Sequence, residues 1–146
     1  MEGMINFEPM EIAEIVYKGG LRCEARHLRS GKVIITDAPP DNQGKGDAFS
    51  PTDLMSTSLG LCMVTIMGIA ARTHGFDIDG TRMKISKIMA AGPRRVTEVH
   101  VEFDMPAIRY SDKEKHILEQ AALTCPVAMS LHPDLVQKVK FNFLMD

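Results

Sequence analysis

The chain has 146 residues, a formal net charge of −2 and 45% hydrophobic residues, which suits one domain, residues 1–146, whose core needs no disulfide or structural metal. Charges of both signs are spread along the chain, and this argues against nucleic acid or an anionic membrane as a partner. The N-terminal residues MEGMINFEPM are acidic and show no basic or apolar region of a signal peptide, which argues against secretion. Three cysteines, an odd number, fit a reduced protein better than a disulfide-bonded one, so we expect a reduced, cytoplasmic protein.

Three strands are predicted near the N-terminus, within residues 12–17, 21–28 and 32–36. In the second of them, Cys23 and Ala25 share one face and Arg22 and Glu24 share the other, which is the period-2 pattern of a half-buried strand. Gly19-Gly20 and Ser30-Gly31 supply the turns. A three-stranded meander is therefore expected, followed by a loop over residues 37–49 that is rich in Pro, Gly and Asp.

Residues 50–75 are predicted to form one long helix. Ser50 suits the N-cap, Pro51 the first helical position and Gly75 the C-terminal stop, while Asp53 completes a capping-box pattern. No residue between Asp53 and Arg72 is charged, and the apolar residues cover too much of the circumference for a surface helix. A membrane span is disfavoured because small and polar residues dilute the apolar run, so we expect a helix buried in the core.

The remaining elements alternate between strands and helices. Strands over residues 81–91 and 96–103 form a hairpin, a capping box at Ser111 opens a helix that ends near Thr124, and Pro126 opens a short helix before a last strand within residues 136–144. The order βββ-α-ββ-αα-β predicts an α+β domain with antiparallel sheets packed on a long central helix. One small sheet cannot cover that helix on all sides, so we expect a two-fold symmetric homodimer.

The cysteines are the residues most suited to chemistry. Cys62 lies among apolar residues of the long helix, where a buried thiol is often only a small hydrophobic residue. Cys125 is at the N-cap of the helix begun by Pro126, where free N–H groups favour a thiolate, although packing is an equally good explanation. Cys23 is most simply a core residue. The chain also offers a cluster of cations that could stabilise a thiolate: Arg22, Arg26 and Arg29.

Two motifs resemble the family of osmotically inducible protein C and organic hydroperoxide resistance protein (OsmC/Ohr). SPTDLMSTSLGLC, ending at Cys62, is similar to the family's helix-opening motif, and Thr124-Cys125-Pro126-Val127 is similar to its second cysteine motif. The resemblance covers nearly the whole chain. It implies an OsmC-like fold, an intertwined homodimer with two active sites at its interface, and an antioxidant role in the oxidative stress response.

The resemblance also implies roles for individual residues. Cys62 would be the redox-active cysteine that attacks an organic hydroperoxide, and Cys125 would resolve it into a disulfide, which an external dithiol of lipoyl or thioredoxin type reduces. Arg22 corresponds best to the family's thiolate-stabilising arginine, and Arg26 is the weaker alternative. The family's acid falls at Thr52, whereas the carboxylate of this chain is at Asp53, about 100° further around the helix. Asp53 is thus either an active-site acid or only a helix cap.

Other sites have little support in the sequence. The five histidines show no metal-binding spacing, and there is no phosphate loop or dinucleotide fingerprint, so no cofactor or metal is expected. An alternative hypothesis is a non-enzymatic protein of the same fold that binds an apolar small molecule or senses redox state. Eleven methionines, which form soft and adaptable surfaces, are compatible with it.

Overall fold

The structure is a computed structural model that describes residues 8–144. The chain divides into two compact units, one ending at Pro51 and the other beginning at Thr52. Each unit has a three-stranded sheet of its own. The observed element order, βββ-α-ββ-αα-β with one added 3-10 turn, is the predicted one, and the α+β class is confirmed.

The first unit is the predicted antiparallel meander. It contains β1 (Ala13–Gly19), β2 (Arg22–His27) and β3 (Val33–Asp37), in the order β1-β2-β3, followed by the 3-10 turn η1 (Pro40–Asn42). Ile15 pairs with Ala25 and Ala25 pairs with Ile34, so these residues share one face of the sheet. That face is apolar, yet Ile15 is 69% exposed. The opposite face carries ion pairs, among them Arg26 with Glu14.

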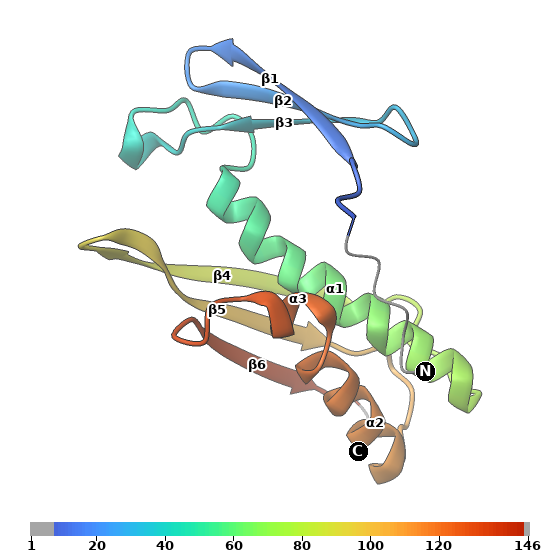
Figure 1. The fold of residues 1–146 in the computed structure, drawn as a ribbon. Coiled ribbons are helices and arrows are strands. Elements are labelled where there is room, and N and C mark those ends of the chain that lie inside the picture. Colours follow the sequence, from blue (N-terminus) through green and yellow to red (C-terminus); the bar gives the residue numbers. More distant parts are fainter. Residues whose placement is uncertain (1–7, 145–146) are drawn as a thin grey trace. The chain divides into compact units, whose positions relative to one another are not determined.

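The sheet of the second unit contains β4 (Arg82–Ala91), β5 (Arg94–Asp104) and β6 (Val136–Asn142), in the order β4-β5-β6 (Figure 1). The predicted hairpin of β4 and β5 is antiparallel, but β6 runs parallel to β5, which corrects the expectation of purely antiparallel sheets. The cause is the crossover through α2 (Asp112–Leu123) and α3 (Pro126–Ser130), which returns the chain to the end of the sheet where β5 began.

The helix α1 (Pro51–His74) begins and ends within one residue of its predicted bounds, and Gly75 follows it with φ of 76°. One face of α1, with Leu59, Met63 and Met67, belongs to the same buried cluster as β5 and α2. The core of the second unit does not cover the opposite face, where Leu61 is 59% exposed. The all-round burial expected from the sequence is therefore not met within the second unit.

Length and composition alone would allow α1 to cross a membrane, although a third of its most apolar window is buried inside the chain. The buried face of α1 packs against the core of the second unit, and this packing explains part of the apolar character of the helix. Gly60 lets α1 approach β4 closely, because a Cβ built there would lie 2.5 Å from Cδ1 of Ile85.

The predicted capping box of α2 is present: Oγ of Ser111 accepts the N–H of Glu114, whose carboxylate accepts the N–H of Ser111.

Candidate functional site

Two of the three cysteines meet at the first turn of α3. Cys125 is the N-cap residue, and its sulfur accepts a hydrogen bond from the backbone N–H of Ala128 at 3.4 Å. The sulfur of Cys62, on α1, accepts one from the N–H of Val127 at 3.5 Å. The fold therefore brings together two cysteines that are distant in sequence, as a two-thiol mechanism requires.

The two thiols differ in their surroundings. Cys125 is fully buried, and burial raises the pKa of its thiol above the usual value, an effect that the Ala128 N–H only partly offsets and that the neighbouring Cys62 increases. Cys62 is partly exposed. The N-cap position predicted for Cys125 is correct, but burial outweighs the helix terminus, so Cys125 holds its proton at neutral pH.

Arg22 is bound within the first unit by an acid that the sequence did not single out. Its Nε and Nη2 donate to Oδ1 and Oδ2 of Asp37 at 2.7 and 2.8 Å, and the backbone N–H of Asp47 donates to Oδ2 at 3.1 Å. The Arg22 guanidinium lowers the pKa of the Asp37 carboxyl, and it does so against the opposing effect of burial. The signal in the sequence was strand register, because Asp37 pairs directly with Arg22 across β2 and β3.

Asp53 binds a lysine that sequence analysis also missed. Nζ of Lys87 lies 2.7 Å from Oδ1 of Asp53 and donates to Oγ1 of Thr52 at 2.8 Å. Lys87 comes from β4 and shares the strand face of Ile85, which packs against α1 at Gly60. Thr52 and Asp53, the two positions in question for the family's acid, are thus both engaged with Lys87.

The remaining predicted residues, Arg26 and Cys23, lie in the first unit. Arg26 is paired with Glu14 on an exposed face, and Cys23 is half-buried in β2. Within residues 8–144, no group of three or more His, Cys, Asp or Glu side chains is arranged to hold a metal ion.

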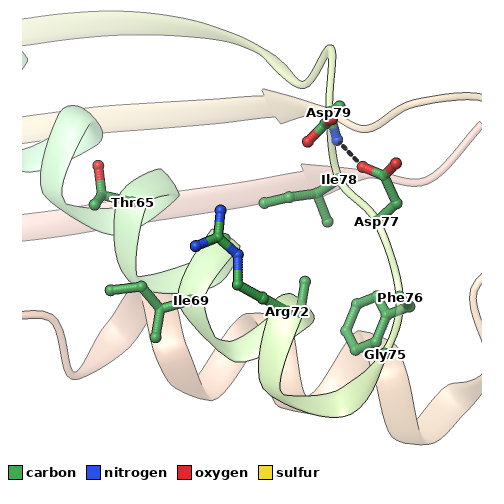
Figure 2. Close-up of a pocket in the computed structure, with 10 residues that line it drawn as sticks. Thr65, Ile69, Arg72, Gly75, Phe76, Asp77, Ile78 and Asp79 are labelled. Carbon is green, nitrogen blue, oxygen red and sulfur yellow. Dashed lines mark hydrogen bonds between the residues drawn. The ribbon is translucent and has the colours of Figure 1, made fainter.

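The described part of the second unit, residues 52–144, contains two sizeable cavities, and neither is lined by a cysteine. The larger, about 670 Å³, lies at the C-terminal end of α1 and the loop that follows it. Figure 2 shows Arg72 extending into it between Thr65 and Ile78, with the carboxylates of Asp77 and Asp79 beyond. The smaller, about 490 Å³, lies between the start of α1, the start of β5 and the loop after α3.

The sequence profile of OsmC-like proteins matches residues 44–140. No curated protein matches the chain. A crystal structure from Psychrobacter arcticus 273-4, assigned as an osmotic stress induced and detoxification response protein, is 52% identical and superposes with a TM-score of 0.88, covering 94% of this chain and 100% of that one.

Two more distant crystal structures share the fold. An organic hydroperoxide resistance protein OsmC from Legionella pneumophila is 13% identical, with a TM-score of 0.72 over 92% of this chain and 99% of that one. A structure from Vibrio cholerae, assigned as an organic hydroperoxide resistance protein and containing captopril in one of its active sites, is 14% identical, with a TM-score of 0.72 over 96% of this chain and 97% of that one. At these identities the likeness concerns the fold alone.

Proposed function

Because the chain belongs to the OsmC-like protein family, we propose that it is a thiol peroxidase that reduces organic hydroperoxides through Cys62 and Cys125. The observation that carries the proposal is the binding of both sulfurs to successive backbone N–H groups of α3. Relatives of the same fold are named organic hydroperoxide resistance proteins, which supports a redox role.

The reaction assigns a different task to each thiol. The Cys62 thiolate attacks the O–O bond, so that an S–O bond forms, the O–O bond breaks and the alcohol leaves with a proton. The sulfur of Cys125 then attacks the Cys62 sulfenic acid, which releases water and forms a disulfide. An external dithiol of lipoyl or thioredoxin type restores both thiols by exchange and is itself oxidised. The partial exposure of Cys62 and the full burial of Cys125 support this order.

Arg22 is the proposed cation for the Cys62 thiolate. Its bidentate contact with Asp37 fixes the guanidinium in one orientation, which is the task that the family's acid performs at the position of Thr52. Asp37 would therefore replace that acid. The ion pair of Asp53 with Lys87 favours a role for Asp53 at the start of α1, and a direct part in the reaction stays a prediction.

We also propose a homodimer in the cytoplasm. In the first unit the apolar sheet face of Ile15 and Ile34 is exposed, and in the second unit Leu61 and Ile69 of α1 are exposed. Contiguous apolar faces of this kind usually mark an interface. A second copy of the chain is the natural partner because most oligomers of soluble proteins are symmetric.

The test is consumption of cumene hydroperoxide with dihydrolipoamide or reduced thioredoxin as the electron donor. Wild-type protein should turn over, Cys62→Ser should be inactive, and Cys125→Ser should lose sustained turnover while a sulfenic acid accumulates on Cys62. Cys23→Ser serves as the matched control and should keep full activity. Full activity of Cys62→Ser would contradict the proposal.

A further inference from the structure

We call the smaller cavity the seam cavity. It exists because two paired strands, β5 and β6, begin at different positions along the sheet. β5 begins at Arg94, whereas β6 begins only opposite Glu98. Arg95 and Val96 therefore lie beyond the start of β6, and the loop between α3 and β6 passes beside them. A bulge in the pairing of β4 and β5 at Ile88 and Met89 places Val96 among the buried residues of β5.

The inner surface of the seam cavity is apolar. Val96 and Leu135, both buried, form its floor, and Met55 and Leu131 line its sides. Its volume of about 490 Å³ lies inside the range of about 300–1,000 Å³ that is usual for small-molecule sites. A hydrocarbon chain of moderate length would meet aliphatic side chains and one adaptable methionine there.

The rim of the seam cavity is polar and offers donors. Arg95 is exposed, and its guanidinium makes no hydrogen bond or ion pair with any other residue of the described range 8–144. Nδ1 of His132 accepts the backbone N–H of Asp134 at 3.0 Å, so the neutral ring carries its proton on Nε2. The Asp134 carboxylate is 75% exposed to solvent, which screens its charge.

From this combination we propose that the seam cavity binds a small anionic amphiphile, of the class of medium-chain carboxylates. The carboxylate would lie against Arg95, which can bind it through two parallel N–H groups, and the alkyl chain would lie between Met55, Leu131 and the floor. The larger cavity fits such a ligand less well, because two carboxylates, Asp77 and Asp79, line it together with the single cation Arg72 (Figure 2).

The test uses octanoate, well below its micelle concentration, and protein labelled with ¹³C at the methionine methyl groups. The Met55 methyl signal, assigned through Met55→Leu, should shift saturably. Arg95→Ala should weaken binding at least tenfold. Two variants remove the same charge elsewhere: Arg72→Ala in the larger cavity and Arg109→Ala on an exposed segment. Both should bind within twofold of wild type, and 1-octanol should bind more weakly than octanoate.

The proposal is overturned if the Met55 signal does not shift saturably, if Arg95→Ala loses no more affinity than Arg109→Ala, or if Arg72→Ala is the variant that loses binding. None of these measurements uses a peroxide or a thiol. Failure here would thus leave the proposed peroxidase untouched, and an inactive wild type in the peroxidase assay would leave this proposal untouched.

Discussion

The sulfur of Cys62 accepts the backbone N–H of Val127, which lies 65 residues further along the chain. The reason is the sequence of α3. Pro126 occupies its first helical position and has no N–H, so Val127 and Ala128 carry the first donors of the helix. Each of these two N–H groups binds one sulfur, that of Cys62 or that of Cys125. A five-residue helix thereby fixes both thiols.

The raised pKa of Cys125 predicts slow alkylation at neutral pH. In a time course with iodoacetamide, Cys62 should be modified before Cys125, and the Cys125 rate should increase only above the ordinary thiol pKa of about 8.5. Peptide mass spectrometry measures both rates. Faster modification of Cys125 than of Cys62 at neutral pH would contradict the assignment of Cys62 as the attacking thiol.

The raised pKa of Cys125 also predicts how the stability of the protein changes with pH in the alkaline range. Between the unfolded and the folded pKa of Cys125, the unfolded thiol has lost its proton while the folded thiol keeps it. The folded state then binds more protons, so the free energy of unfolding decreases as pH rises from about 8.5 through the folded value. Urea denaturation of wild type and Cys125→Ala across this range should show a steeper decrease for wild type, and parallel curves would refute the prediction.

The contact between Arg22 and Asp37 predicts that it stabilises the first unit at neutral pH and that this stabilisation is lost in acid. The pKa of Asp37 is lowered in the folded state, so its contribution is fully present above the unfolded pKa of about 3.9 and is lost as pH falls through the folded value. Asp37→Asn should lower the urea midpoint at neutral pH, and the difference should shrink at about pH 2.5. Glu14→Gln, at the exposed pair with Arg26, is the control and should change little.

Local signals in the sequence predicted the elements well, and long-range partners much less. Pro51 and Gly75 delimit α1 because helix ends depend on nearby residues, and the capping box of Ser111 behaves likewise. The Asp53 contact with Lys87 joins residues 34 positions apart, and nothing local distinguishes Lys87 from a solvated strand lysine. The parallel β6 was missed because alternation fixes the face of a strand but not its direction.

Two glycines of α1 should respond oppositely to the same substitution. A side chain at Gly60 would meet Ile85 and Met83 of β4, whereas one at Gly68 meets nothing within 4 Å. Gly60→Leu should therefore cost about 1–3 kcal/mol through overpacking, and Gly68→Leu should stabilise by about 0.5–1 kcal/mol through helix propensity. Chemical denaturation measures both, and equal effects of leucine at the two positions would disprove the close contact.

The proposed dimer predicts different results for two adjacent residues of β1. Ile15 lies on the apolar face of the first sheet, and Val16 lies on the face that carries the ion pairs. Ile15→Asp should shift the protein to monomer in sedimentation velocity runs, because a carboxylate on an apolar interface is desolvated without a partner. Val16→Asp should remain dimeric. A monomeric wild type at micromolar concentration would remove the basis of this prediction.

The pair of Asp53 and Lys87 predicts an asymmetry between its two members. The first turn of α1 favours a negative charge and disfavours a positive one, because its free N–H groups form the positive end of the helix dipole. Asp53→Asn leaves the half-buried Lys87 ammonium beside that positive end, whereas Lys87→Met leaves the Asp53 carboxylate where the helix itself stabilises it. We expect Asp53→Asn to lower the free energy of unfolding by about 1 kcal/mol or more and Lys87→Met to lower it by less.

The peroxidase assay separates a role of Asp53 at the start of α1 from a role in catalysis. If Asp53 acts only at the start of the helix, Asp53→Asn should keep the peroxidase rate per folded molecule. A large loss of rate without a loss of stability would instead establish Asp53 as an active-site acid.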